Sequence, residues 1–192
     1  MKKLVIKTSL ITLASIIVAL SAVFGAFCLF APASVAVFFD GVGNYSASVF
    51  FYEKQYEKSG DILDLDALFI KSYGVKDYGR SEKYLGELIN HDNFESLLSK
   101  DDALSDKEYY YGCYVLSLAK NGKIDKACVV SQEFVSENGY TKHNPLSTLV
   151  LEYVDENTAE NEKQTIKSAI TACTNVSTLQ EEYRVADLQK LN

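Results

Sequence analysis

Residues 8–39 read TSLITLASIIVALSAVFGAFCLFAPASVAVFF and contain no charged side chain over 32 consecutive positions. A helix needs about 20 apolar residues to cross the hydrocarbon core of a bilayer, so this stretch is long enough to span one. The apolar core of a cleavable signal peptide is shorter, about 7–15 residues. The length therefore favours an uncleaved transmembrane anchor, which we place at residues 9–33.

Two small-residue triplets leave cleavage open as the alternative. Residues 31–33 (APA) and 34–36 (SVA) both resemble signal-peptidase sites. Both lie at or beyond the far end of the predicted span. Cys28 does not fit a lipoprotein signal, because Phe27 rather than a small residue precedes it. We retain the uncleaved anchor as the prediction.

The charges on either side of the apolar stretch predict its orientation. Three lysines precede it, the last being Lys7, and the first charge after it is Asp40. Basic residues that flank a span stay on the cytoplasmic side. We therefore expect a single-pass cell-membrane protein with residues 1–8 in the cytoplasm and residues 34–192 in an extracytoplasmic domain.

The segment after the anchor is acidic. From Asp40 to Asn192 it holds 16 basic and 26 acidic side chains, a formal net charge of −10. Binding to nucleic acid depends on neutralising phosphates with lysine and arginine, so this charge argues against a nucleic-acid partner. It also argues against electrostatic adhesion to an anionic lipid surface. The four cysteines form no C-x-x-C pair and the two histidines lie far from them in sequence, so we predict no metal site and no cofactor.

Helical periodicity recurs along almost the whole of this segment. No alternating strand pattern with hairpin chemistry occurs, so the predicted fold class is all-α. Helices are expected at residues 45–56, at 61–73, from 81, from 105 to 120, at 124–137, after 145, around 166–173 and from about 177, with a helical turn near 94–98. A capping box at Ser105 and the pair Asn144-Pro145 mark two of the starts, and Asn121-Gly122 and Asn138-Gly139 mark two of the ends.

Two short segments repeat at an offset of 33 residues. Residues 44–48 follow the pattern Asn-Tyr-x-x-Ser, and residues 77–81 follow Asp-Tyr-x-x-Ser. A third candidate, residues 122–127, has Gly-Lys-Ile-x-x-Ala. Repeat periods near 34 residues are typical of helix-hairpin solenoids. The small residue allows two antiparallel helices to approach closely, and the glycine allows the turn between them.

These segments resemble the second helix of the tetratricopeptide repeat, in which a glycine, a polar residue and a tyrosine precede the small residue and an aromatic-Glu-Lys follows. Residues 43–45 and 52–54 carry that pattern. The resemblance covers about residues 36–139 and implies antiparallel helix hairpins stacked as a short solenoid, with the first helix at residues 33–42. The second copy lacks the glycine, and 46 residues separate the second and third copies. An irregular helical bundle is the alternative.

Four tyrosines, at positions 109, 110, 111 and 114, cluster on the helix expected to open the third repeat. In the family that the chain resembles, the first helices line the groove where partner peptides bind, and tyrosine is a frequent interface anchor. The resemblance therefore implies that Tyr110 and Tyr114 bind a partner. The alternative is that most of these tyrosines fill the interior.

No catalytic motif is present: the chain lacks a nucleophile elbow, a phosphate-binding loop and a zinc-protease signature. Asp61, Asp64 and Asp66 lack the glycine and closing glutamate of a calcium loop and fit a solvated helix start. We expect a membrane-anchored protein–protein interaction module, a scaffold or accessory subunit that binds a protein or peptide and is not an enzyme. The alternative is a small-ligand receptor or enzyme on an irregular bundle, which needs converging titratable groups.

Two of the cysteines should meet across one hairpin. Cys113 and Cys128 are centred between Lys120 and Asn121, at the start of the predicted turn, so they should face each other. Outside the cytoplasm they could form a disulfide, or both could be small buried residues that allow close packing. Cys173 is expected to be remote from both.

Overall fold

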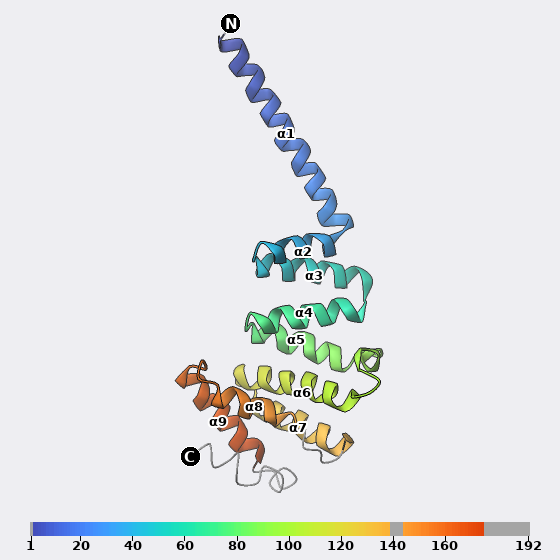
Figure 1. Ribbon diagram of the computed structural model, residues 1–192, viewed down its shortest axis with the longest axis vertical. Coiled ribbons are helices and arrows are strands. Elements are labelled where there is room, and N and C mark those ends of the chain that lie inside the picture. The colour runs from blue at the N-terminus through green and yellow to red at the C-terminus, as the bar shows by residue number, and fades with distance from the viewer. Residues whose placement is uncertain (1, 139–143, 175–192) are drawn as a thin grey trace. The chain divides into compact units, whose positions relative to one another are not determined.

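The computed structural model describes residues 2–138 and 144–174 (Figure 1). Every regular element in these ranges is a helix, which confirms the all-α fold class. The chain divides into two compact units, Met1–Asp64 and Leu65–Asn192. The elements are α1 (Lys2–Phe30), α2 (Pro32–Gly41), α3 (Tyr45–Ser59), α4 (Ile62–Gly74), α5 (Tyr78–Ile89), the short 3-10 helix η1 (Phe94–Leu97), α6 (Ala103–Lys120), α7 (Ile124–Asn138), α8 (Leu146–Val154) and α9 (Glu160–Thr174).

The first unit consists of α1, the antiparallel pair α2–α3 and the start of α4. Residues Thr8–Phe30 of α1 form an apolar stretch long enough to cross a membrane, so α1 could be a membrane anchor or a signal sequence. Ala31 leaves the helical region, at φ −137° and ψ 56°, because a following proline disfavours the α conformation. Pro32 then opens α2, where its missing N–H has no helical partner to lose. The helix expected at residues 33–42 is therefore α2, one residue beyond α1.

The same turn ends α2, α4 and α6. At each end the second residue after the helix has a positive φ, which is 73° at Gly43, 60° at Lys76 and 75° at Gly122. The N–H of the next residue donates to the carbonyl five positions back, and the N–H of the positive-φ residue donates to the carbonyl three positions back. This pair of bonds is the Schellman ending of a helix, which needs a left-handed residue. Three connections thus share one backbone geometry.

The repeated sequence motif has the same structural role in its copies. Asn44 and Asp77 cap α3 and α5, because their side chains accept the N–H of Ala47 at 3.2 Å and of Arg80 at 3.1 Å. The fourth residue of each following helix is fully buried, and these residues are Ser48, Ser81 and Ala127. A small side chain at that position permits close packing against the preceding helix, and Ser81 donates its hydroxyl hydrogen to Ser72 of α4 at 3.2 Å.

In the second unit α6 is the central helix. It packs against α5, α7, α8 and α9, and residues 112–119 of α6 are all buried. Gly112 allows α6 and α8 to approach closely, since a Cβ there would lie 2.1 Å from Oγ1 of Thr148. α8 also packs against α9, and α9 packs against α7. The C-terminal helices therefore enclose the buried half of α6.

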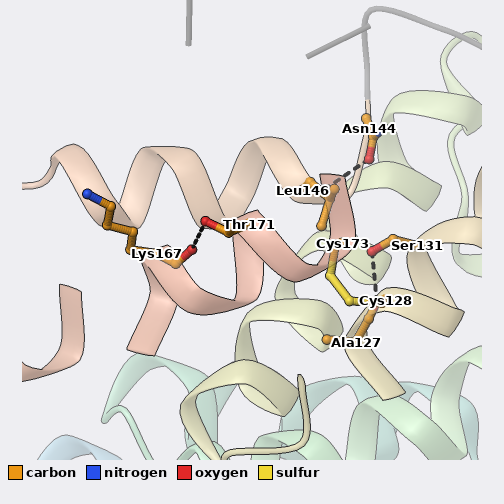
Figure 2. Close-up of a disulfide and its surroundings, with 8 residues drawn as sticks. All are labelled: Ala127, Cys128, Ser131, Asn144, Leu146, Lys167, Thr171 and Cys173. Carbon is orange, nitrogen blue, oxygen red and sulfur yellow. Dashed lines mark hydrogen bonds between the residues drawn. A yellow bond between two sulfur atoms is a disulfide. The ribbon is translucent and has the colours of Figure 1, made fainter. Parts of the chain in front are cut away.

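Cys128 of α7 and Cys173 of α9 form a disulfide, with their Cα atoms 4.7 Å apart (Figure 2). The prediction that Cys173 is remote from the other cysteines is therefore wrong. Cys113 is a buried free thiol, so it is not the disulfide partner of Cys128. Cys173 meets Cys128 because α9 packs against α7. This is a long-range contact, which the spacing of cysteines about the α6–α7 turn does not reveal.

Two helix starts also differ from the prediction. The helix expected from Ser81 begins at Tyr78, because the Asp77 side chain caps it. The helix expected to open at Ser105 begins at Ala103, so Ser105 lies within its first turn and forms no capping box. The neighbouring carboxylate of Asp106 accepts the N–H of Ser99 at 2.6 Å and fastens the preceding loop to this turn. The helix expected from about residue 177 and the stop at Gly139 lie outside the described residues.

Candidate partner-binding site

The four tyrosines of α6 lie in different environments. Tyr109 is 53% exposed and Tyr114 is 7% exposed, while Tyr110 and Tyr111 are partly buried. The difference arises because the N-terminal half of α6 is less enclosed than residues 112–119. Of the two residues predicted to bind a partner, Tyr110 therefore keeps part of its surface open. Tyr114 belongs to the interior, and little of its ring remains accessible to a partner.

Tyr110 is held rigidly between α4 and η1. Its ring centroid lies 5.7 Å from that of Phe69 and 5.4 Å from that of Phe94. Its hydroxyl donates a hydrogen bond to Oδ1 of Asp66 at 3.1 Å. Burial raises the pKa of Asp66, and the hydrogen bond from Tyr110 offsets part of that increase. Burial and the nearby Asp66 charge also raise the pKa of Tyr110, so its hydroxyl stays protonated and continues to donate.

Tyr114 joins three helices from the inside. Its hydroxyl lies 3.1 Å from the position that a Cβ of Gly86 in α5 would occupy, so the glycine makes room for it. The ammonium of Lys126 in α7 lies 5.5 Å from the centre of its ring. A hydrogen bond with Tyr114 is the largest cause that raises the pKa of Lys126. These contacts explain the residue by packing.

Tyr109 and Tyr73 are site residues that the sequence reasoning missed. Both flank the buried thiol of Cys113, whose pKa burial raises to about 11. Burial, followed by the neighbouring Cys113, raises the pKa of Tyr109 to about 12. The thiol therefore stays protonated and lacks the thiolate character of a nucleophile. The spacing of four between positions 109 and 113 signalled their proximity, but nothing in the sequence indicated which tyrosine is exposed.

Together these rings form one continuous aromatic surface on α4 and α6, which we define as Phe69, Tyr73, Tyr109 and Tyr110. Ring centroids of Phe69 and Tyr73 lie 5.7 Å apart, and that of Tyr109 lies 6.1 Å from Phe69 and 5.6 Å from Tyr110. Phe69 is fully buried beneath the others. The three tyrosine rings are thereby packed around one buried phenylalanine ring.

A second cluster, around Lys120, is ionic. The Lys120 side chain is only 5% exposed, and its Nζ lies 2.9 Å from Glu152 and also contacts Glu162. Burial disfavours its charge, but hydrogen bonds to Glu162 and Glu152 outweigh this, so the pKa of Lys120 is raised. Nζ also lies 5.3 Å from the centre of the Tyr78 ring. The cluster fastens the end of α6 to α8 and α9.

The remaining candidate polar residues are separated. Asp61 accepts the N–H of Leu63 at 2.9 Å and Asp64 accepts the hydroxyl of Ser59 at 2.5 Å, as expected of a helix start. His91 accepts the N–H of Asn93 through Nδ1 at 3.1 Å, and His143 lies outside the described residues. In the part of the chain that the structure describes, no three His, Cys, Asp or Glu side chains come together as metal ligands could.

Comparison of the chain with protein-family models, with curated protein sequences and with solved structures finds no significant match.

Proposed function

We propose that this protein is a membrane-anchored protein–protein interaction module, a scaffold or accessory subunit, with a tetratricopeptide-like helical domain and no enzymatic activity. The observation that carries the proposal is the threefold recurrence of one turn with one buried small residue after it. The three turns end at Gly43, Lys76 and Gly122. Repeated helix hairpins are the building units of solenoids, which bind extended partners through exposed side chains rather than by catalysis.

An uncleaved anchor is supported by the position of the two triplets that resemble cleavage sites. Cleavage after residue 33 or 36 would cut within α2. Val35 is 4% exposed and Ala36 is fully buried in the α2–α3 pair. A cut after residue 36 would remove both of these buried side chains, and a cut after residue 33 would remove the buried Pro32 that opens the helix. An intact α2 is compatible with α1 remaining attached.

The disulfide supports the extracytoplasmic placement of residues 34–192. Disulfides form and persist outside the reducing cytoplasm, and Cys128–Cys173 lies in the second unit. This agrees with the lysines that precede the span. Protease added to intact cells should digest the domain, whereas protection until lysis would contradict the orientation.

The partner surface in this proposal is the aromatic surface, with Tyr109 at its most accessible point. Tyrosine anchors contribute strongly to interfaces when few side-chain motions have to be frozen on binding. Here the ring contacts and the bond between Tyr110 and Asp66 already restrict that motion. A peptide with apolar or aromatic side chains and exposed backbone donors fits such a surface.

A photo-crosslinking residue placed at Tyr109 in the full-length protein tests this site. The matched control carries it at Val129, which is 49% exposed on α7. We expect a discrete crosslinked species from position 109 in native membranes. An excess of unlabelled wild-type protein should compete this species away, whereas an excess of the Tyr110→Ala protein should not. Equal labelling from both positions, or none from position 109, would contradict the site.

A further inference from the structure

The first unit has an exposed apolar face directly behind the candidate span. α2 packs against α3 with Val35 and Ala36 buried. On the opposite side of α2, Val37 and Phe38 are 59% and 58% exposed. Adjacent exposed apolar side chains on a short helix mark a contact surface for a partner or a membrane.

This face is continuous with the surface of α1. A groove of about 240 Å³ is lined by Phe24, Phe27, Ser34, Val35 and Phe38. The two α1 residues, Phe24 and Phe27, are 47% and 50% exposed and belong to the apolar stretch of that helix. Because both helices line the groove, the medium that surrounds the end of α1 also reaches Phe38.

Lys58 marks the level at which the apolar region ends. Its Nζ donates a hydrogen bond to the carbonyl oxygen of Phe30 at 3.4 Å, and Phe30 is the last residue of α1. Carbonyls at a helix end lack intrahelical partners. Lysine near the end of a span extends its apolar stem along the bilayer and places its ammonium among the head groups. α2 begins only two residues after Phe30, so it starts near the same level, and it has no charge before Asp40.

We propose that α2 lies in the extracytoplasmic membrane interface, with Val37 and Phe38 inserted among acyl chains and the groove filled by lipid. The inference rests on the proposed uncleaved anchor. Lipid is the occupant because the groove continues the surface that α1 presents to the bilayer. The contact is apolar, so it requires neither anionic lipid nor low salt, unlike the electrostatic adhesion that the acidic domain disfavours.

Tryptophan fluorescence can test this placement, because the chain contains no tryptophan. Full-length Phe38→Trp protein is reconstituted in phosphatidylcholine vesicles, with and without lipid brominated in the upper part of its acyl chains. Phe24→Trp is the control within the span, and Leu151→Trp, at a position 68% exposed on α8, is the control in the second unit. We expect bromine to quench the first two proteins and to leave the third unchanged, at low and at high salt.

The controls separate the possible failures. Quenching of Phe24→Trp without quenching of Phe38→Trp would overturn the interfacial placement and leave the anchor intact. Absence of quenching in both would refute the anchor itself. A blue-shifted, unquenched emission from Phe38→Trp that changes when the protein is diluted with lipid would place a second copy of the chain on this face, and that also overturns the proposal.

Discussion

Lys76 occupies a backbone conformation that disfavours any side chain. Its φ of 60° makes it the only non-glycine residue with positive φ in the described ranges. Gly43 and Gly122 hold the corresponding place in the other two turns. A left-handed conformation costs an L-residue roughly 1–2 kcal/mol. The Schellman bonds are the same in all three turns, so they do not compensate for that cost at Lys76.

Replacing Lys76 with glycine should therefore stabilise the protein. Relief of the strain is partly offset by the greater freedom of glycine in the unfolded chain, about 0.4–1 kcal/mol. The net increase in the free energy of unfolding should be about 0.5–1 kcal/mol. Lys76 also helps to lower the pKa of Asp155 and Glu162, so its charge has a separate effect. Lys76→Ala removes that charge and keeps the Cβ, and the comparison with Lys76→Gly isolates the backbone effect.

The reciprocal change at Gly122 should act in the opposite direction. No atom lies within 4 Å of the position that its Cβ would occupy, so Gly122→Ala introduces backbone strain without a clash. We expect a loss of about 1 kcal/mol. The two variants therefore test the same quantity, the free-energy cost of a side chain at a left-handed position, by removing that cost at Lys76 and adding it at Gly122.

Urea unfolding of the full-length protein in mild detergent measures these differences. Tyrosine fluorescence is a suitable probe because the chain has 13 tyrosines and no tryptophan. In thermal unfolding, 1 kcal/mol corresponds to a shift in Tm of about 2–4 °C for a protein of this size. The reasoning is refuted if Lys76→Gly is no more stable than Lys76→Ala, or if Gly122→Ala matches the wild type.

Three other changes test contacts in the second unit. Cys173→Ser should lower the free energy of unfolding by about 2–5 kcal/mol, because the unfolded chain is then no longer constrained by the disulfide. Alkylation of the denatured wild type without reductant should leave two of its four cysteines unmodified. Asp66→Asn should raise the free energy of unfolding near neutral pH, because burial raises the pKa of Asp66 and so penalises its charged form. Urea titrations should show that this gain disappears below pH 3.8, the ordinary pKa of the group, since Asp66 of the wild type is then protonated in both the folded and the unfolded state. Gly112→Ala should lower the free energy of unfolding by about 1–3 kcal/mol through overpacking. Adding Thr148→Ala should recover part of that loss, and no recovery would contradict the contact between the two positions.

The elements that the sequence predicted well have local signals. α3 and α7 begin at Tyr45 and Ile124 as expected, because the capping Asn44 directly precedes α3 and the positive-φ Gly122 lies two residues before α7. The Asn-Pro pair does precede α8, and Asn144 accepts the N–H of Leu146 at 3.0 Å (Figure 2), but the helix begins at Leu146 with Pro145 rather than Asn144 at its N-cap. The motif Ser105-x-x-Glu108 gave a wrong start because the loop contact of Asp106 fixes the first turn instead.

The candidate site was only partly predictable for a related reason. Helical spacing placed four tyrosines on one helix, but their exposure depends on which helices pack around each ring. Tyr114 is enclosed because Gly86 of α5 and Lys126 of α7 meet it. Tyr109 remains open, although its neighbour Tyr110 is covered by Phe94 of η1. These partners come from elements far apart in sequence, and a single sequence carries no record of their pairing.

The same distinction between local and long-range contacts runs through the whole chain. The first three helix pairs are each closed by a Schellman turn and a buried small residue, both encoded within a few positions. α8 and α9 lack that turn, since Asp155 after α8 is extended at φ −64° and ψ 124°. They pack on α6 and α7 through buried apolar side chains, and the Cys128–Cys173 disulfide and the two glutamates bound to Lys120 add to that attachment. Loss of the disulfide and of the ion pairs should therefore weaken the attachment of α8 and α9 while the turns that define the repeats persist.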